Sequence, residues 1–197
     1  MAFLRSVTAL DGYPVLQGKG VSLRMPIAND YGQWAELRAR SRAFLTPWEP
    51  TWASDELTRS AYRRRLRQYY KELREETGYA FFILRGGDQR LIGGLSLSNV
   101  RRGVTQACTL GYWMGAPHAG QGFMSEAVRV LMPFVFEHLW LHRLEAACLP
   151  ENVSSMRVLE KNGFVYEGLA RRYLKINGSW QDHCLYATVS NVTGGTR

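Results

Sequence analysis

Gly120-Gln121-Gly122-Phe123-Met124-Ser125-Glu126-Ala127 is the stretch of sequence that decides the fold. A pattern typical of a strand precedes it at residues 105–114, and a helical pattern follows it at about 125–138. The two glycines let backbone amides approach a ligand, and the first amides of a helix have no partner inside that helix. A turn of this kind, at the positive end of a helix dipole, favours a phosphate or pyrophosphate.

Other interpretations of this turn compete with the pyrophosphate site. A Walker loop is excluded, because no Gly-Lys-Ser/Thr follows at the needed spacing. A dinucleotide fingerprint requires a third glycine where Ser125 stands, and it opens a parallel sheet instead of following antiparallel strands. A plain strand-to-helix turn without a ligand stays open on this segment alone.

The segments around the turn predict an α+β domain with a mixed sheet. Hairpin turns are indicated at Gly86-Gly87-Asp88 and Asn177-Gly178. Pro133 removes one backbone hydrogen bond inside a helix and predicts a kink or a locally irregular turn there. We expect strands at about 21–24, 79–85, 91–98, 105–114, 143–149, 164–170, 173–176 and 180–189, and helices at about 30–41, 55–76, 125–138 and 153–161.

Local signals place some of the helix ends. Asn29 or Asp30 offers a side-chain oxygen that can cap the first helix, and Gly78 is expected to end the second. The third helix is expected to begin near Ser125.

The composition excludes disorder and a membrane-spanning architecture. The chain has 197 residues, of which 46% are hydrophobic, and no stretch approaches the ~20 apolar residues of a membrane span. We expect a single domain over residues 1–197, with its core at about 10–190 and a frayed tail at 191–197. No apolar signal region follows Met1, and the cysteines and histidines show no metal-ligand spacing, so we expect a cytoplasmic protein without a metal.

The formal net charge of +8 favours an anionic partner, either a nucleic acid, a ribonucleoprotein or a phosphorylated cofactor. The densest basic run, residues 59–74, is mixed with glutamates. A solvated helix face with charge pairs four residues apart is favoured over an RNA-binding stripe, and both interpretations stay open.

A second polar segment follows the next predicted strand. Glu151-Asn152-Val153-Ser154-Ser155 precedes a helix that ends at Lys161-Asn162-Gly163-Phe164. With these residues the sequence resembles the GCN5-related N-acetyltransferase (GNAT) family. The glycine-containing stretch is similar to the family's acetyl-coenzyme A pyrophosphate loop, and Asn152-x-x-Ser155 with Asn162-Gly163-Phe164 is similar to its second cofactor motif. The resemblance implies a GNAT-like fold, with a mixed, mostly antiparallel twisted sheet that is flanked by helices and splayed at the acetyl-coenzyme A site.

Within that family, segments across about residues 20–187 resemble the RimJ-type ribosomal-protein-alanine N-acetyltransferases. The segments are Phe44-Leu-x-Pro47-Trp48-Glu49-Pro50, Ser98-Asn99-Val100-x-Arg102-Gly103, Leu110-Gly111-Tyr112, His142-Arg143, and Tyr173-Leu174-x-Ile176-x-Gly178-x-Trp180-x-Asp182-His183. Two positions depart from the pattern. Ala119 stands where the wider family often carries Gln or Arg, and Pro133 is unexpected in its helix.

The resemblance implies roles for the cofactor side of the site. A backbone amide near Trp113 or Met114 is expected to face the acetyl oxygen, whereas the side chains of Tyr112 and Trp113 receive no catalytic part. Asn152 is expected to hydrogen-bond the pantetheine arm of the cofactor, and a helix cap is its alternative. The pyrophosphate is expected to lie on Gly120, Gln121, Gly122, Met124 and Ser125.

Further residues are expected to serve proton transfer and the acceptor. Ser155 matches a position proposed to protonate the leaving thiolate, with a local backbone contact as its alternative. Glu167 is the candidate general base, and a solvated or arginine-paired carboxylate is the alternative. Glu49 is expected to receive the incoming amine, and Trp48 with Trp52 to wall the substrate groove.

Taken together, the resemblance implies an enzyme that transfers acetyl from acetyl-coenzyme A to the α-amine of a protein N-terminus, with an alanine of a ribosomal protein as the favoured acceptor. We expect direct attack in a ternary complex, because no cysteine lies in an activating motif. One alternative is an acetyltransferase for a small amine such as an antibiotic or a polyamine. The other is a binding module on the same fold that associates with ribosomes or RNA through residues 59–74.

Overall fold

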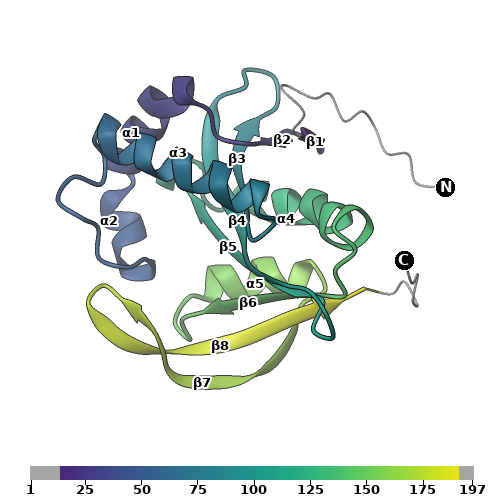
Figure 1. The fold of residues 1–197 in the computed structure, drawn as a ribbon. Helices are drawn as coiled ribbons and strands as arrows, with labels where there is room; N and C mark the ends of the chain where they lie inside the picture. Colours follow the sequence, from purple (N-terminus) through teal and green to yellow (C-terminus); the bar gives the residue numbers. More distant parts are fainter. Residues whose placement is uncertain (1–13, 191–197) are drawn as a thin grey trace.

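One mixed sheet organises the computed structural model, which describes residues 14–190 (Figure 1). In the described residues the strand order is β1-β2-β3-β4-β5-β6-β8-β7. Neighbouring strands are antiparallel except for β5 and β6, which are parallel, so the sheet is mixed and mostly antiparallel, as the GNAT resemblance implied. The strands are β1 (Leu16–Gln17), β2 (Val21–Arg24), β3 (Tyr79–Arg85), β4 (Leu91–Arg101), β5 (Ala107–Met114), β6 (Arg143–Cys148), β7 (Val165–Ile176) and β8 (Ser179–Val189).

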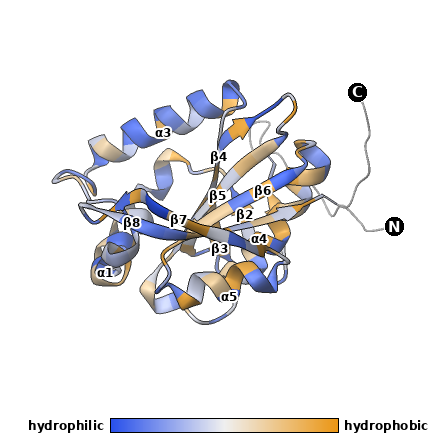
Figure 2. Cartoon of the chain, turned by 90° about the horizontal axis from the view of Figure 1, so that it is seen from below, coloured by the Kyte–Doolittle hydropathy of each residue, from blue (hydrophilic) through white to orange (hydrophobic). Residues whose placement is uncertain are grey.

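Helices cover both faces of this sheet. They are α1 (Tyr31–Arg40), α2 (Arg42–Leu45), α3 (Arg59–Arg74), α4 (Phe123–Pro133) and α5 (Val153–Lys161). Successive side chains of a strand point to opposite faces, so Ile83 joins the hydrophobic cluster under α4 and α5, whereas Phe82 joins the cluster under α1 and α3. The outer side of α3 is largely hydrophilic in the view from below (Figure 2). The sheet therefore separates two packed layers.

The parallel pair β5–β6 comes apart halfway along. Its ladder joins Ala107–Leu110 to Arg143–Ala146 and stops there. Beyond it, Gly111–Met114 pairs only with β4, and the end of β6 pairs only with β8. One edge of the backbone at Gly111–Met114 thus has no strand partner, which is the predicted splay.

The second helix is shorter than its predicted span of 55–76. It starts at Arg59 because Thr58 caps it, its Oγ1 accepting the Ala61 N–H at 3.2 Å. The chain leaves the helix through Glu76, whose φ is +53°, so Gly78 does not end it as predicted. The residues before Arg59 form turns.

The predicted cap of the first helix is also wrong. The Asp30 carboxylate accepts the Ile27 N–H at 2.8 Å and pairs with Arg24, so it braces a short 3-10 turn that precedes α1. Neither Asn29 nor Asp30 caps α1 through its side chain. The two-residue strand β1 was not predicted, because two residues carry no periodicity.

The irregularity expected at Pro133 is confirmed. The helix α4 starts at Phe123, two residues before the predicted start, and passes at Phe134–His138 into a wider, π-helical turn. The Leu139 N–H donates to the Phe134 carbonyl at 2.9 Å, five residues back. Proline lacks the N–H that would donate to the carbonyl of Arg129, four residues back, and the change of helix type begins at the residue that follows Pro133.

The two predicted strands 164–170 and 173–176 form a single strand, β7, which contains two register shifts. Arg172 lies at one of them with a φ of +47°, and Asp182 accepts its N–H at 2.8 Å. Asp182 therefore holds this hairpin. The predicted fraying of 191–197 concerns residues outside the described range.

Candidate active site

The turn before α4 has the geometry of an anion site. Gly120 and Gly122 have φ angles of +73° and +83°, which side chains with a Cβ rarely adopt. A Cβ added at either glycine would meet no atom within 4 Å, so the space above the turn is open. The N–H groups of Phe123, Met124 and Ser125 belong to the first turn of α4, where no carbonyl of the helix can accept them. These residues fit a pyrophosphate group.

Two side chains of the sequence motifs brace this turn from outside. Asn162, at the end of α5, donates to the Ser125 Oγ at 3.2 Å and to the Val158 carbonyl at 2.8 Å. Glu126 accepts the Lys19 N–H at 2.6 Å. The start of α4 is thereby tied to α5 on one side and to the β1–β2 turn on the other.

The splayed edge of β5 leads from this turn toward the centre of the sheet. Trp113 and Met114 lie on the segment that pairs only with β4, so this side of their backbone is free of the parallel ladder. The backbone amides that are expected to donate a hydrogen bond to the acetyl oxygen therefore lie beside the gap between β5 and β6.

Across the gap, α5 presents Asn152 and Ser155. The Asn152 Oδ1 accepts the Ser155 N–H at 3.0 Å and so caps α5, which was the structural alternative for Asn152. The Tyr112 hydroxyl lies 2.7 Å from the Ser155 Oγ, and burial raises the pKa of Tyr112 above its ordinary value. Tyr112 stays protonated near neutral pH and can donate to Ser155.

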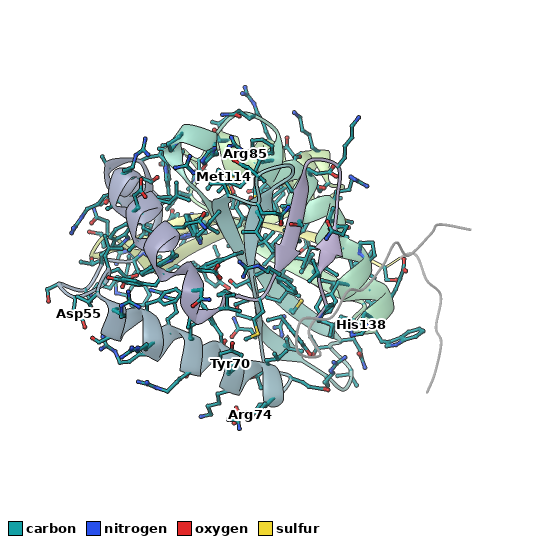
Figure 3. The ribbon with its side chains drawn as sticks, turned by 90° about the horizontal axis from the view of Figure 1, so that it is seen from above. Asp55, Tyr70, Arg74, Arg85, Met114 and His138 are labelled. Carbon is teal, nitrogen blue, oxygen red and sulfur yellow. The ribbon has the colours of Figure 1, made fainter. Side chains whose placement is uncertain are left out.

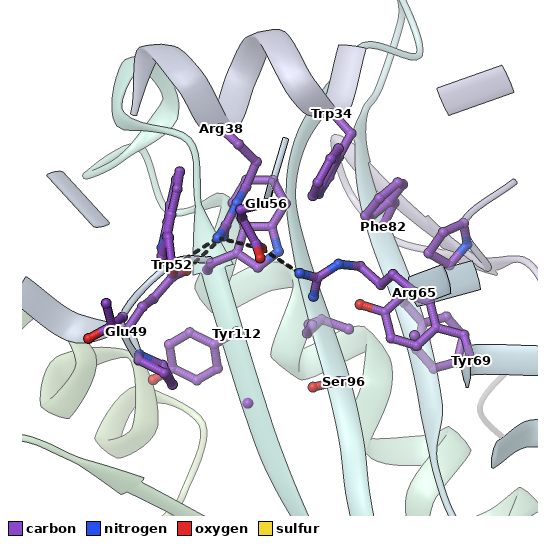
Figure 4. Close-up of a pocket in the computed structure, with 18 residues that line it drawn as sticks. Trp34, Arg38, Glu49, Trp52, Glu56, Arg65, Tyr69, Phe82, Ser96 and Tyr112 are labelled. Atoms are coloured by element: carbon purple, nitrogen blue, oxygen red, sulfur yellow. Dashed lines mark hydrogen bonds and ion pairs between the residues drawn. The ribbon is translucent and has the colours of Figure 1, made fainter. Parts of the chain in front are cut away.

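A cavity of about 360 Å³ opens on the α1 and α3 side of β5 (Figure 4). Its floor includes Gly111, Tyr112 and Trp113, which belong to the splayed part of the strand. The walls come from α1, α3 and the segment around residues 49–56. The cavity therefore reaches the same segment of β5 that carries the splayed edge.

Two arginine–glutamate pairs line this cavity. Arg38 is 6% exposed, and its two terminal nitrogens donate to Glu49 at 2.7 Å each. Arg65 pairs with Glu56, which also lies 3.9 Å from Arg38. Trp52 donates its indole N–H to Glu49 at 2.7 Å. Figure 4 shows Glu56 between the two arginines.

The predicted acceptor residues divide into two groups. Glu49 and Trp52 line the cavity, whereas Trp48 does not. The Asn177 N–H, at the tip of the β7–β8 hairpin, donates to the Glu49 carbonyl at 3.0 Å. The terminal hairpin thus closes against the acceptor segment.

Glu167 is not brought together with these residues. Its carboxylate forms a two-point ion pair with Arg143, at 2.8 Å for one contact, and it does not line the cavity. The guanidinium of Arg143 lowers the pKa of Glu167. The sequence left open a solvated or paired carboxylate beside Arg171 and Arg172, and in the structure the partner is Arg143 instead.

Sequence reasoning missed Arg38, Glu56 and Arg65, and it gave Tyr112 no role. One signal was present for Arg38, which follows Trp34 by four residues and therefore lies on the buried face of α1. A charged residue on an apolar face needs a buried partner, and the sequence does not say that the partner is Glu49.

Within residues 14–190, no helix combines the length and apolar character needed to cross a bilayer. In the same range, no group of three or more His, Cys, Asp or Glu side chains is arranged to hold a metal ion.

Comparisons with known proteins agree with this geometry. The family model for the acetyltransferase (GNAT) domain matches residues 21–165. The chain is 39% identical over 176 residues to the probable N-acetyltransferase YjcK of Bacillus subtilis (strain 168), covering 89% of this chain and 97% of the relative. It is 33% identical over 163 residues to the [ribosomal protein uS5]-alanine N-acetyltransferase of Escherichia coli (strain K12), covering 82% of this chain and 84% of the relative.

A solved structure of Mycobacterium smegmatis RimJ in complex with CoA-disulfide superposes with a TM-score of 0.84. It is 31% identical, and the match covers 90% of this chain and 87% of that one. The fold, the splayed strand pair and the match over residues 21–165 agree with one another. The chain belongs to the GNAT family of acetyltransferases.

Proposed function

We propose that this enzyme transfers an acetyl group from acetyl-coenzyme A to the α-amine of a protein N-terminus, with an N-terminal alanine of a ribosomal protein as its acceptor. The observation that carries the proposal is that a candidate cofactor region and a candidate acceptor cavity both reach the same segment of β5. The open glycine-rich turn and splayed edge lie toward α4 and α5, and a separate cavity reaches Gly111–Trp113 from the other face. The printed activity of the E. coli relative supports the choice of acceptor. Acetyl-coenzyme A and ribosomal proteins meet in the cytoplasm, where we place the reaction.

The residues of the turn and the edge would hold the donor. When bound, acetyl-coenzyme A supplies an acetyl group activated as a thioester. The amides from Gly120 to Ser125 hold its pyrophosphate at the start of α4. An amide of Trp113 or Met114 on the splayed edge stabilises the developing oxyanion, and Asn152 contacts the pantetheine arm.

Proton transfer needs one donor and one acceptor. The Ser155 hydroxyl serves as the proton donor to the leaving thiolate, held by the hydroxyl of Tyr112 at 2.7 Å. Glu167 is the base proposed from the sequence. Its pairing with Arg143 lowers its pKa, which makes the carboxylate a weak base for an ammonium group, so the proton of the attacking amine passes to solvent water.

The burial of the cysteines supports a direct attack of the amine on acetyl-coenzyme A, without an acetyl-cysteine intermediate. Cys108, Cys148 and Cys184 are buried. Cys148 lies on β6 just beyond the point where β5 and β6 separate, and burial raises its pKa to about 11. A thiol with that pKa is almost entirely protonated at neutral pH, so it is not an activated acyl carrier.

A transfer assay tests the proposal. Short peptides that begin with alanine, serine or methionine, an N-terminally blocked alanyl peptide, a polyamine and an aminoglycoside are offered with labelled acetyl-coenzyme A. We expect turnover of the alanyl peptide and none of the blocked one. Intact-mass analysis of ribosomal proteins treated in the same way identifies the natural acceptor. Turnover restricted to the small amines would establish the small-amine alternative in place of this proposal.

A second candidate function, RNA association, is favoured by the outer face of α3. Arg65 and Tyr69 face the cavity from this helix, whereas Arg63, Arg67 and Arg74 are exposed at positions that share the opposite side. These arginines run from the second turn of α3 to its last residue, Arg74, which is labelled in Figure 3, so the cationic side extends along most of the helix. We propose that this side contacts RNA phosphates near the acceptor.

The salt dependence of RNA binding tests the second candidate. Arg63→Glu with Arg67→Glu should weaken binding and reduce the slope of log affinity against log salt by about two, because two phosphate contacts are lost. The matched control is Arg171→Glu with Arg172→Glu, which reverses two charges that are exposed on β7. Equal losses in both double variants would show that net charge alone is responsible.

A further inference from the structure

The Arg38 guanidinium is held on three sides inside the cavity. Its two terminal nitrogens donate to Glu49, which fixes one edge of the plane. The ring of Trp52 lies 4.3 Å from its central carbon and that of Trp113 lies 5.0 Å away. A guanidinium fixed in this way keeps a single orientation.

One donor of this group has no partner. Within the described residues, the Nε of Arg38 is the buried side-chain nitrogen or oxygen that makes no hydrogen bond. The Nε–H lies on the same edge of the guanidinium as the terminal nitrogen Nη2. The Glu56 carboxylate lies 3.9 Å from Nη2, and it already pairs with Arg65. A buried N–H without an acceptor is unfavourable, so a ligand oxygen at this edge would be stabilised.

The charges of the cavity select against polycations. Arg38 and Arg65 compensate Glu49 and Glu56, so each carboxylate already has a cationic partner. A polyamine would bring several positive charges to carboxylates that are occupied, and it carries no oxygen for the Arg38 edge. A peptide N-terminus carries one amine and, one carbon away, a carbonyl oxygen.

We infer that the free edge of Arg38 donates to the carbonyl oxygen of the acceptor's first residue. The cavity thus recognises an α-aminoacyl group, and Arg38 determines specificity for it over a bare amine. The inference rests on the proposed function, because it requires the acceptor amine to enter this cavity. Arg38 acts on the acceptor and has no part in holding the donor.

A single-atom change in the substrate tests this contact. An alanyl peptide is compared with the same peptide in which sulfur replaces the first carbonyl oxygen, since a thiocarbonyl is a weaker hydrogen-bond acceptor. We expect kcat/KM of the wild-type enzyme to fall about tenfold to a hundredfold, the effect of losing a hydrogen bond to a charged group. Sulfur at the second carbonyl is the matched control and should change kcat/KM less than threefold.

Two variants separate recognition from folding. Arg38→Lys keeps a cation beside Glu49 but lacks the planar edge, so the preference for oxygen over sulfur should disappear. Arg65→Lys is the control and should retain that preference. Acetyl-coenzyme A affinity and thermal unfolding are measured for both variants. If Arg38→Lys does not fold, the substrate pair in the wild-type enzyme still decides the matter.

The outcomes for the wild-type enzyme are distinguishable. Equal kcat/KM for the oxygen and sulfur peptides would overturn the role of Arg38 and leave N-terminal acetylation intact. Failure to acetylate either peptide would overturn the proposed function, and the inference with it.

Discussion

The two faces of β5 carry binding regions that the chain builds in opposite ways. On the α4 side, the proposed cofactor contacts are mostly backbone amides, at the glycine-rich turn and along Gly111–Met114, with the side chains of Asn152 and Ser155 across the gap. On the α1 side, the groups are side chains, and the cavity depends on Arg38, Glu49, Glu56 and Arg65. These four residues come from α1, the segment before α3, and α3 itself.

The difference teaches how each region tolerates change. A backbone site needs only the correct φ and ψ angles and open space, so it withstands most substitutions except those that fill the space. The side-chain site consists of mutually dependent charges, because each arginine is neutralised by a glutamate under a low local dielectric. Damage to one member leaves its partner buried without compensation.

The largest expected effect comes from filling the backbone site. Gly122→Glu places a bulky anion at the start of α4 on a residue with a φ of +83°. Acetyl-coenzyme A affinity should fall more than about a hundredfold, because the carboxylate occupies and repels the position of the pyrophosphate. Calorimetry measures the affinity. Gly122→Asn, which tolerates this φ without a charge, is the control and should retain most of it.

A folded Gly122→Glu variant with wild-type affinity would show that the pyrophosphate does not lie on this turn. The α4 side of β5 would then no longer be the cofactor-binding region in this comparison of the two faces.

The next effect concerns the side-chain site. Glu49→Gln removes the carboxylate that pairs with buried Arg38 and leaves a cation next to a neutral amide. We expect a loss of roughly 2 kcal/mol in the free energy of unfolding, since hydrogen bonds to charged groups contribute about that much. Thermal denaturation should show a melting temperature lower by about 5 °C. Acetyl-coenzyme A affinity should be unchanged, and a parallel loss of that affinity would mean that the two faces are coupled.

The contrast also explains what the sequence could predict. The turn, α5 and the Asn177-Gly178 hairpin are local features, in which the residues that carry the signal are neighbours in the chain. Their spans in the structure agree with the sequence within about two residues. The splay at Leu110 came from the resemblance, because no local pattern marks where a parallel ladder ends.

The acceptor cavity was less predictable because its contacts are not local. Arg38 and Glu49 are eleven residues apart, and Tyr112 reaches Ser155 across 43. Trp48 and Trp52 look alike in the sequence, each two residues from Pro50, yet of the two only Trp52 lines the cavity. Which indole turns inward is set by its hydrogen bond to Glu49, a packing detail that periodicity does not encode.

A smaller effect is expected where the two faces meet. Tyr112→Phe removes the hydroxyl that lies 2.7 Å from Ser155 while keeping the ring that lines the cavity. One neutral hydrogen bond is worth about 1 kcal/mol, so kcat should fall roughly fivefold with KM for either substrate unchanged. Ser155→Ala is measured alongside, and the double variant should be no slower than the slower single one. Fully additive losses would show that Tyr112 does not act through Ser155.

The smallest effect is expected at Glu167. Because Arg143 depresses its folded-state pKa, the pair stabilises the protein at neutral pH, and the stabilisation is lost as the pH falls below the ordinary range of a glutamate. The pair is partly exposed, so Glu167→Gln should change the free energy of unfolding by less than about 1 kcal/mol at pH 7, and this change should shrink as the pH falls through the lowered pKa of Glu167. The pH–rate profile should keep its shape, since the carboxylate is already committed to Arg143. An acidic limb that moves upward in this variant would instead identify Glu167 as the base, and would place a catalytic side chain beyond the cavity of the acceptor face.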